Sequence, residues 1–188
     1  MIVRIFMACC ALFAGAGTAL AGPMMTDWAV GHKSKARLLV GALPAPDGRL
    51  RIYAGVEVAM ESGWKTYWRH PGDAGGVPPY FDWSKSQNIK ATKQLFPTPT
   101  RFRDVDGMSI GYKSHVVLPV EIELKSKDQR VGLAVDFQYG VCREICIPAR
   151  ARLALAVEPA DLRSMPPQLA VALATVPRRQ SEATDRSP

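Results

Sequence analysis

Two cysteines near the end of the chain, Cys142 and Cys146, are separated by only three residues. A fully extended strand would place residues four positions apart at about 13 Å, since each residue adds about 3.3 Å. A disulfide needs Cα atoms about 4.4–6.8 Å apart. If these cysteines are bonded, the chain must reverse direction at Arg143, Glu144 and Ile145, or coil for one helical turn.

The short spacing also bears on what such a bond would do. Closing a loop of about five residues stabilises a fold by only about 2 kcal/mol in the chain-entropy model. A bond that serves stability gains more from closing a long loop, whereas short or exposed disulfides are the ones that exchange readily. The spacing therefore favours a redox pair over a structural link.

The first 21 residues have the features of a secretory signal peptide. Arg4 supplies a positive charge, residues 5–20 form an uncharged apolar run, and Ala19-Leu20-Ala21 is a small-x-small cleavage site. A membrane anchor is the alternative, but the run is short because a spanning helix needs about 20 residues and this run contains glycines. We expect cleavage after residue 21, which also removes Cys9 and Cys10.

Export implies an oxidising compartment in which disulfides persist, and we expect a periplasmic protein. The sequence after residue 21 has no further long apolar run, so we expect no stable membrane insertion once the signal is cleaved. The formal net charge of the whole chain is +7. For an exported protein we expect no nucleic-acid partner, and the charge is consistent with solubility.

Alternating apolar and polar residues, interrupted by turn signals, recur along the rest of the chain. The pattern predicts a flexible lead-in at 22–35, one domain at 36–177 and a disordered tail at 178–188. Within the domain, strands are predicted at 36–43, 50–60, 63–69, 80–83, 89–96, 115–124, 130–139 and 150–157, with a hairpin or loop at 101–112 and a helix at 166–176. Many short strands and one short C-terminal helix are typical of an all-β sandwich. Pro119 indicates that its strand lies at an edge or carries a bulge.

The glycine- and proline-rich stretch 70–79 predicts a long loop, and long loops in compact domains are often functional. His70 begins this loop and would tune a thiolate if it lay near the cysteines. Just before it, Trp64, Thr66 and Trp68 would share the core face of a strand. A soft-metal alternative would require His70, His115 or Met108 to converge on the two cysteine thiolates, because zinc normally takes four ligands. A separate copper site would use Met24 and Met25, in the segment that also holds His32, near the mature amino end.

Several blocks of residues, in this order, resemble a known family. They are Gly63-Trp64-Lys65-Thr66-Tyr67-Trp68-Arg69-His70-Pro71-Gly72-Asp73-Ala74-Gly75, Pro78-Pro79-Tyr80-Phe81-Asp82-Trp83, Phe96-Pro97-Thr98-Pro99, Gly111-Tyr112, Leu118-Pro119 and Tyr139-Gly140-Val141-Cys142-Arg143-Glu144-Ile145-Cys146-Ile147-Pro148. The chain resembles the N-terminal periplasmic domain of the membrane thiol:disulfide interchange reductase DsbD. It is also similar to the variant of that domain found in ScsB proteins.

The resemblance implies an immunoglobulin-like β-sandwich in which Cys142 and Cys146 are the active residues, without a cofactor. It implies that they accept electrons from a membrane thiol:disulfide reductase and pass them to periplasmic thioredoxin-like proteins. It also implies an aromatic cap loop that shields the cysteines. The candidates for that cap are Tyr80, Phe81, Phe96 and Phe102. The best-known members space their cysteines more widely, and this chain shows no membrane domain, so we expect the electron donor to be a separate protein.

The predicted chemistry is thiol–disulfide exchange, in which one thiolate attacks a partner disulfide and the second cysteine resolves the mixed disulfide. Arg143 would favour a neighbouring thiolate, and Glu144 would oppose it. The sequence leaves open which sulfur attacks. Besides metal binding, two alternatives remain: an exported sandwich with a structural Cys142–Cys146 bond, and a binding module without redox chemistry.

Overall fold

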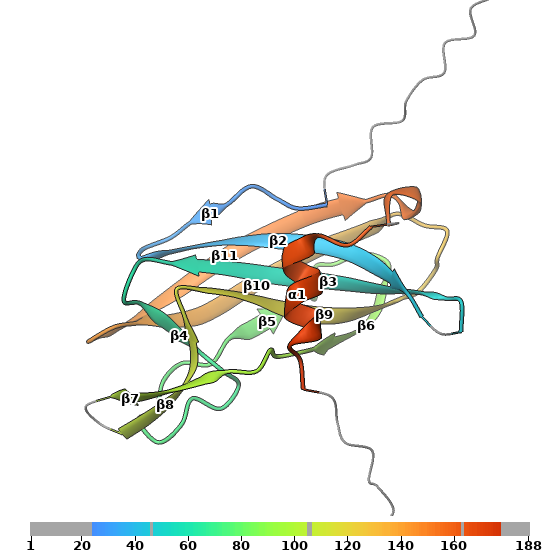
Figure 1. The fold of residues 1–188 in the computed structure, drawn as a ribbon. Helices are drawn as coiled ribbons and strands as arrows, with labels where there is room; N and C mark the ends of the chain where they lie inside the picture. Colours follow the sequence, from blue (N-terminus) through green and yellow to red (C-terminus); the bar gives the residue numbers. More distant parts are fainter. Residues whose placement is uncertain (1–23, 46, 105–106, 163, 178–188) are drawn as a thin grey trace, which may run out of the picture.

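The computed structural model describes residues 24–177, apart from residues 46, 105–106 and 163 (Figure 1). The signal peptide predicted at 1–21 and the tail predicted at 178–188 therefore lie outside the described residues. Within the described ranges, no helix is long and apolar enough to cross a membrane.

Two antiparallel sheets form the fold, as the alternating pattern predicts. The first has the order β1-β2-β3-β9-β6 and the second the order β11-β10-β4-β8-β7, with β5 paired to β10. The strands of the first sheet are β1 (Ala29–Val30), β2 (Ser34–Pro44), β3 (Leu50–Met60), β6 (Ile89–Gln94) and β9 (His115–Leu124). Those of the second are β4 (Lys65–Tyr67), β5 (Tyr80–Asp82), β7 (Thr100–Asp104), β8 (Gly107–Lys113), β10 (Val131–Cys142) and β11 (Cys146–Val157).

The core lies between the two sheets and is built by period-two alternation. Along β10, every second side chain from Val131 to Tyr139 is at most 3% exposed. Facing strands contribute Val56 and Leu118, which are fully buried. Each buried side chain of this size is worth about 1.5–3 kcal/mol relative to exposure. The other face of each sheet is left free to carry polar groups, a helix or a site.

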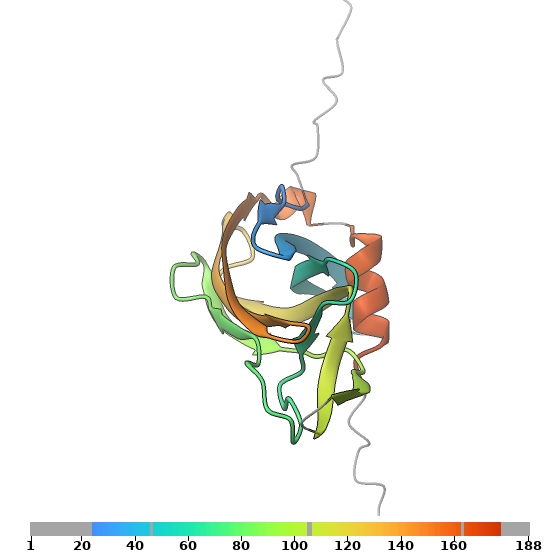
Figure 2. The ribbon, with the colours of Figure 1, turned by 90° about the vertical axis from the view of Figure 1, so that its left-hand side faces the viewer.

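A short 3₁₀ turn, η1 (Pro159–Asp161), and one helix, α1 (Pro167–Ala174), follow the last strand, close to the helix predicted at 166–176. The helix covers the outer face of the sheet that contains β2 (Figure 2). Leu169 is fully buried there, and a Cβ added at Gly55 would lie 2.7 Å from its Cδ1 atom. The absence of a side chain at Gly55 therefore lets the helix pack close to the sheet, since any larger residue there would displace Leu169.

The segment before Ala36 differs from the expected flexible lead-in. The Thr26 amide donates to the Leu38 carbonyl at 2.9 Å, and the Val40 amide donates to the Met24 carbonyl at 2.9 Å. β1 pairs with β2, which begins at Ser34. This segment supplies partners to the outer edge of β2, because an unpaired strand edge leaves backbone groups unsatisfied.

Pro119 lies in a strand with neighbours on both sides and in unbroken register with β3, so the prediction of an edge strand or a bulge is wrong. β9 is between β3 and β6, and Pro119 is opposite Gly55 of β3. The Pro119 carbonyl accepts from the Leu95 amide, just beyond Gln94, where β6 ends. The backbone of Pro119 faces β6 on this side, and the regular ladder between β6 and β9 ends at Gln94 opposite Val120. The N–H that proline lacks is therefore not needed for the ladder.

Candidate functional site

The cysteine pair closes the hairpin of β10 and β11. The two strands are in register from Val131 opposite Val157 to Cys142 opposite Cys146, and the Arg143 amide donates to the Ile145 carbonyl at 3.1 Å. A disulfide joins Cys142 and Cys146, whose Cα atoms are 4.1 Å apart. The chain therefore reverses direction at 143–145, and the helical alternative does not occur.

The two sulfurs have unequal access to solvent. Cys142 is 1% exposed, whereas Cys146 is exposed to solvent. The difference follows from the sheet order, because β10 is flanked by β11 on one side and by β4 at Lys65 on the other, while β11 is an edge strand. Of the two residues, Cys146 is therefore the one open to approach by another protein.

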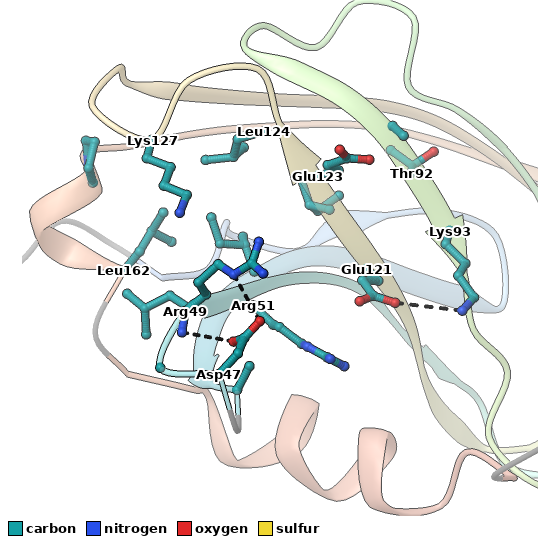
Figure 3. Close-up of a pocket in the computed structure, with 17 residues that line it drawn as sticks. Asp47, Arg49, Arg51, Thr92, Lys93, Glu121, Glu123, Leu124, Lys127 and Leu162 are labelled. Carbon is teal, nitrogen blue, oxygen red and sulfur yellow. Dashed lines mark hydrogen bonds and ion pairs between the residues drawn. The ribbon is translucent and has the colours of Figure 1, made fainter.

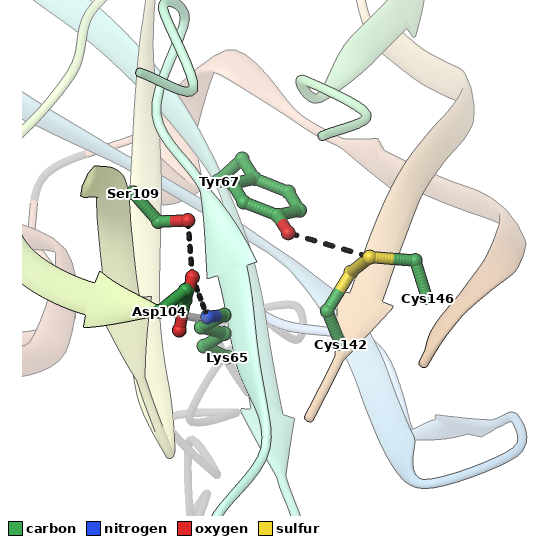
Figure 4. The surroundings of a disulfide bond; sticks show 6 residues. All are labelled: Lys65, Tyr67, Asp104, Ser109, Cys142 and Cys146. Carbon is green, nitrogen blue, oxygen red and sulfur yellow. Dashed lines mark hydrogen bonds and ion pairs between the residues drawn. A yellow bond between two sulfur atoms is a disulfide. The ribbon is translucent and has the colours of Figure 1, made fainter. Parts of the chain in front are cut away.

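A tyrosine of β4 contacts the exposed cysteine. The Tyr67 hydroxyl lies 3.3 Å from Cys146 Sγ, and Figure 4 shows it pointing at the disulfide. The alternation of β4 turns Thr66 into the core, as predicted, so Lys65 and Tyr67 take the opposite face. Tyr67 was not among the predicted site residues, although the alternation around Thr66 places it on the face opposite the core.

The loop at 70–79, predicted to be functional, lies across this outer face. The Ile110 amide of β8 donates to the Pro71 carbonyl at 2.6 Å, and the Gly140 amide of β10 donates to the Val77 carbonyl at 3.3 Å. The loop is thus anchored on strands at both sides of β4. It covers Tyr67, which is 5% exposed although it does not face the core.

Behind Tyr67, a buried lysine and a partly exposed aspartate form an ion pair. Lys65 Nζ contacts the carboxylate of Asp104, and Ser109 Oγ donates to the same carboxylate (Figure 4). The hydrogen bond from Lys65 lowers the pKa of Asp104, and that from Ser109 lowers it further. Burial raises the pKa of Tyr67, the charge of Asp104 raises it too, and a hydrogen bond with Ser109 partly offsets both.

The lowered pKa of Asp104 predicts a pH-dependent stability. The unfolded chain binds this proton near the ordinary aspartate value of 3.8, and the folded chain binds it only at lower pH. The stabilisation is therefore complete above that value and is lost as the pH falls through the folded pKa. In urea unfolding, Asp104→Asn should be less stable than the wild type at pH 7, and the difference should narrow at pH 3. An equal difference at both values would contradict this assignment.

The other predicted site residues make contacts with groups other than the sulfurs. His70 packs edge-on against Trp68 at a ring-centroid distance of 5.5 Å, and His115 Nε2 lies 2.7 Å from the buried carboxylate of Glu57. Arg143 lies over the Trp64 ring, 5.9 Å from its centroid. In the described part of the chain, no three histidine, cysteine or acidic residues are grouped to hold a metal ion.

The aromatic cap candidates do not form a common lid. Phe81 and Phe96 are partly buried against the core, and Phe102 is 7% exposed beneath the Lys113 ammonium. Tyr80 is 61% exposed. The aromatic side chain that contacts Cys146 Sγ is instead Tyr67.

An open pocket of about 790 Å³ lies at the other end of the sandwich (Figure 3). Residues at the start of β3 and at the end of β9 line this pocket, whereas the cysteines lie at the end of β10. Two ion pairs lie on its rim, with Arg49 2.9 Å from Asp47 and Lys93 3.9 Å from Glu121. The pocket therefore has no part in the cysteine site.

An antiparallel sandwich with a half-accessible disulfide at one hairpin end defines a class of domains suited to thiol chemistry. A model of the family described as "Thiol:disulfide interchange protein DsbD, N-terminal" matches residues 48–158. The chain belongs to this family, and its fold is immunoglobulin-like, as the resemblance implied.

Among solved structures, the chain is similar to the N-terminal periplasmic domain of ScsB from Proteus mirabilis. The two share 26% sequence identity with a TM-score of 0.59, over 82% of this chain and 60% of that chain. The chain thus spans about 60% of the length of that structure. No curated protein matches the chain.

Proposed function

We propose that this protein is a periplasmic thiol–disulfide exchange protein, in which the Cys142/Cys146 pair carries electrons between a membrane reductase and thioredoxin-like partners. The observation that carries the proposal is the unequal exposure of the two sulfurs at one end of a DsbD-family fold. A sulfur that forms mixed disulfides must be reachable, and a resolving sulfur is best kept from other reagents.

Cys146 is the attacking residue in this mechanism and Cys142 the resolving one. The Cys146 thiolate attacks a partner disulfide, the partner's S–S bond breaks, and one partner sulfur leaves as a thiolate. Cys142 then loses its proton to water and attacks Cys146 Sγ, so the second partner sulfur leaves and the Cys142–Cys146 bond forms. Two electrons pass to the partner. A donor thiolate that attacks Cys146 Sγ reduces the pair by the reverse sequence.

The turn beside Cys146 suits contact with a protein partner. Ile145, the residue before Cys146, is 67% exposed, and Val77 of the loop that is bound to β10 is 46% exposed. Exposed apolar side chains around a reactive group supply contact area on association. Glu144 lies 3.7 Å from Arg143, so the charges of this turn are paired with one another.

The reduction potential of the cysteine pair tests the proposal. The protein would be equilibrated in glutathione buffers, and free thiols at Cys142 and Cys146 would be counted by alkylation and mass spectrometry. A potential between about −120 and −270 mV is expected, because exposed disulfides are the exchangeable ones. A potential below about −300 mV would assign the bond a structural role and would favour a binding module without redox chemistry.

A further inference from the structure

Tyr67 is packed closely by the loop at 70–79. Gly76 has a φ of +140°, and a Cβ added there would lie 2.4 Å from Tyr67 Cζ. Strand β10 also lies near the ring, since a Cβ at Gly140 would lie 3.6 Å from Tyr67 Cδ2. Only glycine at 76 allows the loop so close to the ring. The hydroxyl has little freedom to leave Cys146.

Two of the polar groups behind Tyr67 are costly to bury. The Lys65 side chain is 8% exposed and Ser109 is 1% exposed, whereas the side chain of Asp104, which forms an ion pair with Lys65, is 29% exposed. The desolvation of the lysine offsets part of its attraction to Asp104, so the pair adds less to stability than its charges alone would give. Such a pair beside a reactive sulfur is therefore a candidate for a functional rather than a stabilising role.

These groups keep a proton on the tyrosine hydroxyl that it can donate to a sulfur. Burial and the charge of Asp104 raise the pKa of Tyr67, so its hydroxyl keeps its proton at neutral pH. The Lys65 ammonium neutralises Asp104 and limits the repulsion between that carboxylate and a nearby thiolate. A protonated hydroxyl aimed at a sulfur stabilises the thiolate form more than the neutral thiol.

Building on the exchange function above, we propose that Tyr67 is a catalytic residue whose hydroxyl donates a hydrogen bond to the Cys146 thiolate and stabilises it. Lys65, Asp104 and Ser109 act as positioning residues that hold the hydroxyl in place and balance the local charge. Tyr67 keeps its own proton throughout. In the reduced protein the hydrogen bond increases the share of Cys146 that is thiolate at neutral pH, so this cysteine is the one that attacks a partner. In the mixed disulfide the same hydrogen bond polarises Cys146 Sγ, the sulfur that Cys142 attacks.

The test is the pH dependence of alkylation at Cys146. In a Cys142→Ser background, the rate of reaction with iodoacetamide would be followed from pH 4 to pH 10 by mass spectrometry of the tryptic peptide that follows Arg143. Tyr67→Phe removes one hydroxyl and keeps the ring packed against the loop at Gly76. We expect it to raise the midpoint of the profile by about one pH unit, and to slow alkylation at neutral pH up to about tenfold.

Tyr139→Phe is the matched control. It also removes a buried hydroxyl from the same sheet, one that lies 2.8 Å from Ser34 Oγ and faces the core. This variant should leave the profile of Cys146 unchanged, while Ser109→Ala should shift it in the same direction as Tyr67→Phe but less. An unchanged profile in a folded Tyr67→Phe protein, or equal shifts in both tyrosine variants, overturns the role of Tyr67.

The readout needs no exchange partner, so the two proposals fail separately. A protein whose Cys146 profile depends on Tyr67 but whose cysteine pair has a potential below about −300 mV would overturn the exchange function alone. A protein that exchanges in the expected range and shows no dependence on Tyr67 would overturn the tyrosine's role alone.

Discussion

Replacing Cys146 with serine is expected to reduce exchange with a thioredoxin-like partner to the background rate. Cys146 is the exposed sulfur, while the 1% exposure of Cys142 prevents it from reaching a partner disulfide. Without Cys146 no mixed disulfide forms, and the reaction has no first step. The measurement is the rate at which the reduced variant transfers electrons to an oxidised partner, followed by partner thiols.

Replacing Cys142 with serine should abolish turnover as well, but the reaction should stop at a later step. Cys146 can still attack, but no second thiolate is present to resolve the product, so the mixed disulfide accumulates. A non-reducing gel should show a covalent complex with Cys142→Ser and none with Cys146→Ser. If Cys146→Ser traps the partner instead, the roles of the two cysteines are reversed. If neither variant impairs transfer, the exchange mechanism is wrong.

Replacing Phe137 with alanine is expected to destabilise the fold by about 3–5 kcal/mol, because a large buried aromatic side chain leaves a cavity that the sheets fill only in part. Phe137 is fully buried in β10. Its ring stacks on Tyr139 at a centroid distance of 4.5 Å and lies 4.9 Å from the Phe81 ring. The free energy of unfolding from urea titration measures this loss.

The neighbouring residue provides the control for this prediction. Gln138 lies on the outer face of the same strand and is exposed, so Gln138→Ala should change the stability by no more than about 0.5 kcal/mol. Both variants keep the cysteines, so a folded Phe137→Ala protein should retain the potential of the pair. A loss at Gln138 equal to that at Phe137 would contradict the placement of the core.

The strands and the buried face of each could be predicted from the sequence, because the alternation of apolar and polar residues along a strand indicates which face meets the core. In β10, for example, the residues from Val131 to Tyr139 alternate as predicted. The ends of the strands were predicted less well. The two strands of the hairpin stay paired as far as Cys142 and Cys146, beyond the predicted limits of 130–139 and 150–157. The ladder continues there through backbone hydrogen bonds, which leave no mark in the side-chain pattern.

By itself, the sequence determined that a Cys142–Cys146 bond needs a reversal of the chain, that the core lies between sheets, and that the pair stands between the last two strands. Only the tertiary structure decided which sulfur is accessible, since that depends on β10 lying inside the sheet and β11 at its edge. It also decided that Tyr67 meets Cys146 across 79 residues of sequence. Neither local propensity nor periodicity encodes such a contact, because it arises from the order in which strands are paired.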